Sequence, residues 1–335
     1  MRRRVLHWPE PRTELPRPAD ARALAGSAHV WFERVRAMDV TGGPADSDVF
    51  AAERLAEPRP ILPGLPDNRP LVMGIVNVTP DSFSDGGETP DRATAVARAR
   101  AMVEAGADIL DIGGESTRPG AEDVAVAEEI VRTAPVIAEL RAAGIDTPLS
   151  IDTRKAPVAA AALREGADMV NDVAALTHDP ELGPLVAEAG VPLCLMHAQG
   201  TPQTMQNDPR YGDVLIEVHL WLVERMAAAE AHGIDRARLV VDPGLGFGKT
   251  LEHNVTLLKG LALMHDLGAP ILLGASRKRF IGTLSGVKEP GARLAGSLAV
   301  ALHAAGQGAQ ILRVHDVAET VQALALWRAL TREKV

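Results

Sequence analysis

The stretch from Leu149 to Asn171 reads LSIDTRKAPVAAAALREGADMVN, and it contains one full repeat of the pattern that decides the fold. A short apolar run ends at Asp152, an Ala-rich segment of helical character follows, Gly166 comes next, and a second apolar run begins. Apolar runs that alternate with amphipathic helical segments are typical of a parallel sheet covered by helices. The same pattern extends in both directions, beginning at Leu71.

Eight apolar runs of this kind predict eight buried strands. Their residues are 71–76, 108–112, 149–152, 168–171, 192–196, 239–242, 270–274 and 310–314. A glycine suited to a left-handed helix end precedes seven of the runs, namely Gly106, Gly144, Gly166, Gly190, Gly233, Gly268 and Gly308. Eight β/α units over roughly 250 residues favour an α/β fold of the TIM (β/α)8 barrel type over an open doubly wound sheet.

The first 68 residues differ from the rest, since they are rich in Pro and Arg and show no β/α alternation. Within them, residues 21–38 are expected to form a helix, and Pro58, Pro60, Pro63 and Pro66 to form a stiff linker. We therefore expect an N-terminal extension of unknown role over residues 1–68 and a catalytic barrel over residues 69–335.

Composition excludes several classes of partner. Hydrophobic residues make up 46% of the chain and charged residues 24%, with a net charge of −9, which argues against nucleic acid and anionic membranes. No apolar run approaches the ~20 residues of a membrane span. The start of the chain does not resemble a secretory signal, and a single cysteine, Cys194, fits a reducing cytoplasm.

Polar side chains follow all eight predicted strands, at the end of a barrel where active sites lie. They include Asn77, Asp111, Asp152, Asn171, His197, Asp242, Ser276, Lys278, Arg313 and His315. All three phenylalanines beyond residue 68, Phe83, Phe247 and Phe280, fall in these loops or just beyond them, where a flat heterocycle could pack on them. Taken together, the eight strand ends predict one site.

Single residues in this set have simpler explanations. An isolated Asp or Asn after a strand is more often a helix cap than a ligand, and Met196 alone is more often core. His197 is equally well a rim histidine whose hydrogen bonds are satisfied within the protein. Lys249 is expected to be an exposed loop cation, and Cys194 an inert buried thiol. The run Gly244–Lys249 is not a P-loop, because three residues rather than four precede its Gly-Lys pair.

The loops closely resemble the dihydropteroate synthase family. The matching stretches are residues 74–87 (GIVNVTPDSFSDGG), 111–120 (DIGGESTRPG), 150–153 (SIDT), 242–249 (DPGLGFGK), 276–278 (SRK) and 313–316 (RVHD). The resemblance implies a transferase that joins 6-hydroxymethyl-7,8-dihydropterin diphosphate to p-aminobenzoate, releasing pyrophosphate with Mg²⁺, and that is a target of sulfonamides. It covers about residues 70–333 and leaves the extension out.

The resemblance also implies a pterin slot deep in the barrel. A pterin edge offers paired N–H donors, which the carboxylate of Asp242 can accept together. The other residues expected to bind pterin are Asp152, Asn171, Met196, Phe247 and Lys278.

Loops nearer the rim are implied to bind the diphosphate and p-aminobenzoate. Pyrophosphate would be held by Asn77, Thr117, Arg118, Arg313 and His315, with Mg²⁺ bridging Asn77 and the phosphates. The residues expected to be catalytic are Asn77, Arg118, Lys278, Arg313 and His315. Walls and contacts for p-aminobenzoate would come from Phe83, Thr117, Pro119 and Ser276, and Asp85 would pair with Arg118 when the loops close.

Two other functions share the barrel. A pterin-dependent methyltransferase domain would keep the acidic slot but has no need for Arg313 and His315 as a diphosphate site or for the Ser276–Lys278 motif. A pseudoenzyme would bind without turnover, yet every matched position is occupied. Family analogy further predicts a homodimer formed through the last helices.

Overall fold

All eight predicted strands are present in the computed structural model, which describes residues 4–46, 48, 50–78, 92–116, 118 and 120–332. They are β5 (Leu71–Asn77), β6 (Ile109–Gly113), β7 (Leu149–Asp152), β8 (Met169–Asp172), β9 (Leu193–Met196), β10 (Leu239–Asp242), β11 (Leu272–Gly274) and β12 (Ile311–Val314). The parallel sheet runs in the order β10-β9-β8-β7-β6-β5-β12-β11. A parallel bridge between Val241 and Ile271 joins its two edges, so the sheet closes into the predicted TIM barrel.

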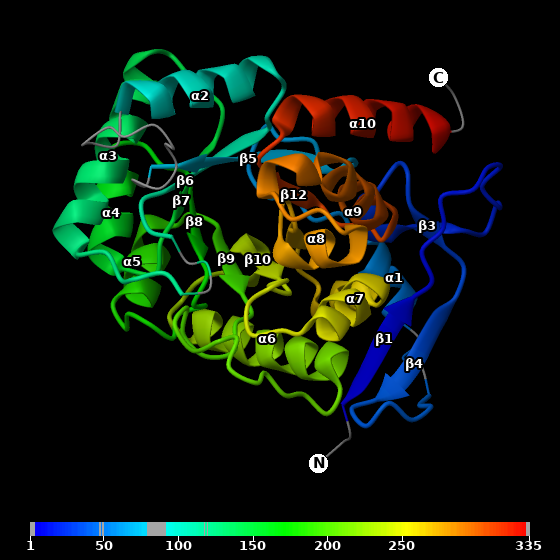
Figure 1. Ribbon diagram of the computed structural model, residues 1–335. Helices are drawn as coiled ribbons and strands as arrows, with labels where there is room; N and C mark the ends of the chain where they lie inside the picture. Colours follow the sequence, from blue (N-terminus) through cyan, green and yellow to red (C-terminus); the bar gives the residue numbers. More distant parts are fainter. Residues whose placement is uncertain are drawn as a thin grey trace.

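Helices surround this barrel (Figure 1). They are α2 (Arg92–Glu104), α3 (Val126–Ala142), α4 (Ala156–Arg164), α5 (Leu182–Ala189), α6 (Val214–Ala231), α7 (Leu251–Lys259), α8 (Arg279–Ser285), α9 (Leu294–Gly306) and α10 (Val317–Leu330), with short 3-10 turns η3 (Arg236–Arg238), η4 (Leu261–Leu267) and η5 (Pro290–Arg293). The seven glycines expected before the strands all have φ between +67° and +103°, which confirms that prediction. None of the helices in the described ranges is long and apolar enough to cross a membrane.

The barrel interior is apolar at one end and polar at the other. Because side chains alternate along a strand, residues two apart point to the same side. The inward positions nearer the strand starts form a buried cluster of Leu71, Met73, Ile109, Met169, Cys194, Val240, Leu272 and Ile311. The next inward positions carry Asp111, Asp152, Asn171, Asp242 and Arg313. Alternation therefore places the polar residues together above an apolar floor.

Residues 21–38 do not form the expected helix. They contain β2 (Arg22–Ala23), η1 (Leu24–Gly26), β3 (Trp31–Phe32) and β4 (Val35–Asp39), and β4 pairs antiparallel with β1 (Val5–Pro9). Gly26 at φ +76°, and the β-preferring Trp31, Phe32 and Val35, oppose a continuous helix. A short helix, α1 (Ala51–Ala56), comes later.

The N-terminal extension packs on the barrel, beside α7, α9 and α10 in Figure 1. Its Leu24, Val30, Phe32 and Leu55 form a buried cluster that Trp327 of α10 joins. Ile61 and Leu65, from the Pro-rich segment, pack against the apolar floor of the barrel. The segment expected to be a linker thus covers the base of the barrel.

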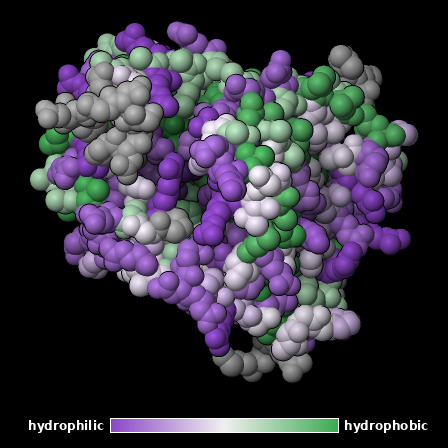
Figure 2. Space-filling view, viewed as in Figure 1, coloured by the Kyte–Doolittle hydropathy of each residue, from purple (hydrophilic) through white to green (hydrophobic). Residues whose placement is uncertain are grey.

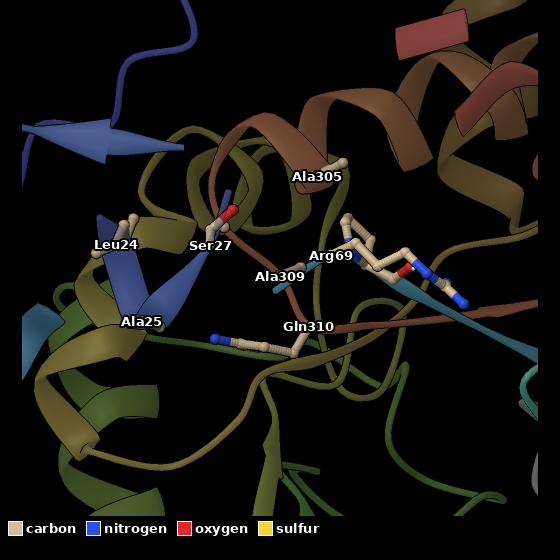
Figure 3. Close-up of a pocket in the computed structure, with 9 residues that line it drawn as sticks. Leu24, Ala25, Ser27, Arg69, Ala305, Ala309 and Gln310 are labelled. Carbon is tan, nitrogen blue, oxygen red and sulfur yellow. Dashed lines mark hydrogen bonds between the residues drawn. The ribbon is translucent and has the colours of Figure 1, made fainter. Parts of the chain in front are cut away.

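Polar contacts add to this packing at the junction. Arg59 is 6% exposed, and its guanidinium donates to His265 Nδ1 (3.0 Å), His265 O (2.9 Å) and Ala269 O (3.1 Å). The imidazole of His7 lies 3.0 Å from the carboxylate of Asp266. Figure 3 shows a small pocket of the same junction, with Leu24, Ala25 and Ser27 on one side and Ala305, Ala309 and Gln310 of the barrel on the other.

The buried Arg59 makes the junction testable. Arg59→Met removes the donors of three hydrogen bonds and leaves buried acceptors unpaired, so we expect the free energy of unfolding to fall by about 2–4 kcal/mol. Urea unfolding measures this. The control is Arg36→Met in the same extension, whose side chain is 69% exposed and pairs with Glu10; its change should stay within about 0.5 kcal/mol. Equal losses from the two variants would contradict the role of Arg59.

Candidate active site

The guanidinium of Arg313 lies between two buried carboxylates at the carboxyl ends of the strands. From β12 it reaches across the barrel and donates through Nε to Asp111 Oδ2 on β6 (2.5 Å) and through Nη2 to Asp152 Oδ2 on β7 (2.6 Å). Asn171 on β8 donates through Nδ2 to the same oxygen of Asp111 (3.0 Å). The structure thus brings Arg313, Asp152 and Asn171 together around Asp111, which accepts from both Arg313 and Asn171.

Burial dominates the electrostatics of this cluster. It raises the pKa of Asp152 to about 7, against the opposing effect of Arg313, and the neighbouring Asp111 adds to the rise. For Arg313 burial acts to lower the pKa, but the two carboxylates outweigh it and raise the pKa above its ordinary value. Asp111 Oδ1 is buried and accepts no hydrogen bond from any described residue. A ligand donor could therefore gain a bond at this oxygen.

Asp242 ends β10 on the same side of the barrel and is 5% exposed. Its Oδ1 accepts from Gly244 N at 2.7 Å, and burial raises its pKa. Burial also lowers the pKa of Lys278 to about 8, although Asp242 acts in the opposite direction. Lys278 Nζ donates to Leu245 O and lies 4.6 Å from the centroid of the Phe247 ring. Asp242, Lys278 and Phe247 thus converge as predicted.

The loop that carries Phe247 is tightly constrained. Gly244 has φ +65°, and a Cβ there would lie 1.9 Å from His197 O, so only glycine fits. Lys249 is 3% exposed, which contradicts the expected exposed cation; its Nζ lies 2.8 Å from His197 Nδ1 and donates to Phe247 O at 3.0 Å. Burial, followed by Lys249, lowers the pKa of His197 to about 2, so its imidazole is a neutral acceptor. Lys249 and His197 thus hold the β10–α7 loop through their contacts with its backbone and with each other.

Ser276 and His315 form a third contact between strand-end loops. Ser276 Oγ accepts from His315 N (3.1 Å) and lies 3.0 Å from His315 Nδ1. Burial, then Arg313, lowers the pKa of His315 to about 3, so the ring would meet an anion as a neutral donor rather than as a cation. Next to them, Arg277 at φ +60° is held by a donor contact from Nε to Asp316 (3.0 Å).

The remaining predicted residues lie around this cluster or outside the described part. Asn77 is half-buried at the end of β5, Met196 is 3% exposed at the end of β9, and Arg118 is exposed on the β6–α3 loop. Phe83, Asp85, Thr117 and Pro119 lie outside the described residues. Asp111 was expected among the polar strand ends but without an individual role, although its spacing of two from inward-facing Ile109 places it on the interior side.

The arrangement combines an acidic slot with cations near its opening. Asp111, Asp152, Asn171 and Asp242 offer acceptors and an amide, which suits a heterocycle with several N–H donors. In the space-filling view, hydrophilic side chains gather over the region where β9 and β10 end (Figure 2). No three His, Cys, Asp or Glu side chains of the described ranges lie together as a metal site.

Comparison with known proteins agrees with this geometry. Residues 73–315 match the family described as pterin binding enzyme. The dihydropteroate synthase of Escherichia coli K12 is 49% identical over 267 residues, covering 80% of this chain and 94% of that protein. The enzyme of a Synechocystis strain is 48% identical over 264 residues, covering 78% and 91%.

Solved structures give the same result. Xanthomonas albilineans dihydropteroate synthase with 4-aminobenzoic acid is 54% identical, with a TM-score of 0.74 over 78% of this chain and 93% of that one. The enzyme from the same organism in complex with 7,8-dihydropteroate is 51% identical, with a TM-score of 0.72 over 79% and 95%. On fold, site and similarity, the chain belongs to the dihydropteroate synthase family of pterin-binding transferases.

Proposed function

We propose how this chain carries out the reaction of its family, the joining of 6-hydroxymethyl-7,8-dihydropterin diphosphate to p-aminobenzoate in folate biosynthesis. The observation that carries the proposal is the cluster of Arg313, Asp111, Asp152 and Asn171 beside Asp242. It offers acceptors for the pterin and a cation for the diphosphate within one barrel opening.

The pterin enters the acidic slot. Asp242 accepts two N–H donors of the guanidine-like edge, while Asp152 and Asn171 pair with the other ring atoms, and Asp111 Oδ1 is a further acceptor. Lys278 meets the carbonyl and N5 side of the ring, and Phe247 and Met196 cover its faces. A ligand with the wrong donors would leave buried groups unpaired, so the slot selects strongly.

The diphosphate is held by Arg313, His315 and Asn77 at the rim, with Arg118 and Thr117 from the β6–α3 loop. The donor set suits Mg²⁺, because Asn77 offers a hard carbonyl oxygen and the substrate's phosphate oxygens can supply further ligands. When bound, Mg²⁺ would supply charge neutralisation at the leaving pyrophosphate. The residues themselves hold and orient the diphosphate, and the guanidinium of Arg313 stabilises its developing charge.

The arylamine of p-aminobenzoate attacks after the C–O bond has largely broken, in an SN1-like path. A strong base is not required, because the amine is itself the nucleophile and positioning with electrostatics lowers the barrier. Ser276, next to His315, would contact p-aminobenzoate, and the family motif assigns Thr117 to the same substrate. Phe83 and Pro119 would form its walls, and Asp85 would pair with Arg118 as the loops close.

Two cellular properties belong to the same proposal. The only cysteine, Cys194, is buried as a free thiol, which supports a reducing cytoplasm as the setting. Exposed leucines on two of the later helices support a homodimer: Leu284 of α8 is 62% exposed, and Leu326 and Leu330 of α10 are 66% and 73% exposed.

The activity is tested by incubating the purified protein with the pterin diphosphate, p-aminobenzoate and Mg²⁺ and measuring pyrophosphate release. Asp242→Ala should abolish turnover and weaken pterin binding about a hundredfold, since the ring donors lose their acceptor. Asp235→Ala, at the N-cap of η3 before β10, is the control and should leave turnover and pterin affinity unchanged. A wild-type protein that releases no pyrophosphate would refute the function, and an Asp242→Ala variant that keeps its affinity would refute the slot.

The charge of Lys278 predicts a pH dependence. With its pKa lowered to about 8, the ammonium loses its proton as the pH rises through about 8. We expect kcat/KM for the pterin diphosphate to fall over that range. In Lys278→Arg the guanidinium stays protonated, so the fall in kcat/KM should move to higher pH, even if kcat/KM at neutral pH is lower than in the wild type. If kcat/KM falls over the same alkaline pH range in both proteins, deprotonation of Lys278 is excluded as the cause of the fall.

Light scattering coupled to size exclusion tests the dimer. The wild type should elute with twice the mass of one chain, and Leu326→Glu combined with Leu330→Glu should elute with the mass of one. Val131→Glu on α3 is the control, because Val131 is 71% exposed at a different place and its change should leave the dimer intact. A monomeric wild type would disprove the assembly.

A further inference from the structure

The β6–α3 loop, which carries Arg118, is closed at its neck by two consecutive cations from another strand. These are Arg154 and Lys155, which follow β7 and precede α4. The neck consists of Glu115 at the start of the loop and Asp123 and Val124 at its end. Neither cation touches the Arg313 cluster through a hydrogen bond, and the function proposed above gives them no part.

Lys155 joins both sides of the neck to helix α3. Its Nζ donates to Glu115 Oε1, to Val124 O and to Glu129 Oε2, each at 2.7 Å. Glu115 Oε1 also accepts from Val124 N at 2.9 Å. The Lys155 ammonium thus donates one hydrogen bond to the start of the loop, one to its end and one to the first turn of α3.

Arg154 closes the neck a second time. Its Nε donates to Glu115 Oε2 at 3.0 Å, and its Nη2 donates to Asp123 Oδ1 at 2.6 Å. Each of the two cations therefore bridges the beginning and the end of the loop. Such a double bridge fixes the separation of the two ends more firmly than a single contact.

The four central charges balance one another. Glu115, Glu129, Arg154 and Lys155 are at most 8% exposed, and two are acids and two are bases. Burial alone would raise the pKa of Glu115, but the hydrogen bonds from Lys155 and Arg154 outweigh it and lower that pKa. Removing one cation would therefore leave a buried carboxylate uncompensated, and the loop would have to move for water to reach it.

Arg118 and Gly120, beyond this neck, relate the loop to His315 and to the β9–α6 loop. Arg118 lies near enough to His315 to contribute to the lowered pKa of that ring. Gly120 N donates to Pro202 O of the β9–α6 loop at 2.8 Å. The neck thus sets the base from which Arg118 extends, and a displacement there would be carried to the rim of the site.

We propose that Lys155 and Arg154 are positioning residues for the reaction, which set the β6–α3 loop so that Arg118 reaches the rim where p-aminobenzoate and the diphosphate meet. This inference rests on the proposed function, because it assigns the loop to the second substrate. Neither residue touches substrate; both act through Glu115 and the loop.

If Lys155 positions the loop, its replacement should weaken binding of p-aminobenzoate but not of the pterin. In Lys155→Met we expect KM for p-aminobenzoate to rise about tenfold, since the loop loses its fixed geometry. Binding of 6-hydroxymethyl-7,8-dihydropterin without its diphosphate, measured by calorimetry, should stay within about twofold, because the deep slot does not involve the loop. Asp108→Asn is the control, since it breaks the Arg69–Asp108 pair at the base of the barrel (2.6 Å) and should lower stability without raising KM.

A second variant avoids the buried charge. The side chain of Asp123 is 66% exposed, so Asp123→Lys should fold normally while placing a cation against Arg154. We expect KM for p-aminobenzoate to rise about threefold in Asp123→Lys. Its neighbour Glu122 is also exposed, and Glu122→Lys makes the same change of charge one residue away. Glu122→Lys should leave KM unchanged.

A double mutant shows whether the effect passes through Arg118. If it does, Asp123→Lys should add less than about twofold to KM in an Arg118→Ala background, whereas independent effects would multiply. Equal KM values for Asp123→Lys and Glu122→Lys, or multiplying effects in the double mutant, would overturn the positioning role. Loss of pyrophosphate release already in the wild type would instead count against the proposed function.

Discussion

The pairing of the Arg313 guanidinium with Asp111 and Asp152 is the interaction on which the site depends. It joins β12 to β6 and β7 across the barrel, at 2.5 and 2.6 Å, and it places a positive charge between two buried carboxylates. Without this cation the pKa of Asp152, already raised to about 7, would rise further, and the slot would lose the Asp152 carboxylate as a charged acceptor. In the proposed complex the guanidinium of Arg313 binds the anionic leaving group. The carboxylates of Asp111 and Asp152 accept hydrogen bonds from the donor-rich ring.

The rest of the molecule keeps this polar cluster in place. Below it lies an apolar floor that includes Met73, Met169 and Cys194, which excludes water from the barrel interior. Ile61 and Leu65 of the N-terminal extension cover that floor from the base, so the extension is part of the packing that supports the site. Around the opening, the loops after β6 and β10 are each held by a buried lysine, Lys155 and Lys249.

Periodicity in the sequence predicted the barrel because strand alternation and helix spacing are local properties. The same approach failed for residues 21–38, where pairing with β1 decides the structure, and for Lys249, whose burial depends on His197 from a different strand. Motif resemblance named Asp242 and Lys278, which do converge. It assigned no individual role to Asp111, nor to Lys155, because a hydrogen-bond partner on a distant strand or loop cannot be identified from a local motif.

The most direct test of the site is a crystal structure of the protein with the pterin diphosphate bound. The account predicts that the pterin edge contacts Asp242, that a ring donor reaches Asp111 Oδ1 or Asn171, and that the guanidinium of Arg313 contacts a phosphate oxygen. A ligand seated elsewhere, or one that leaves Arg313 bound only to its two carboxylates, would contradict it.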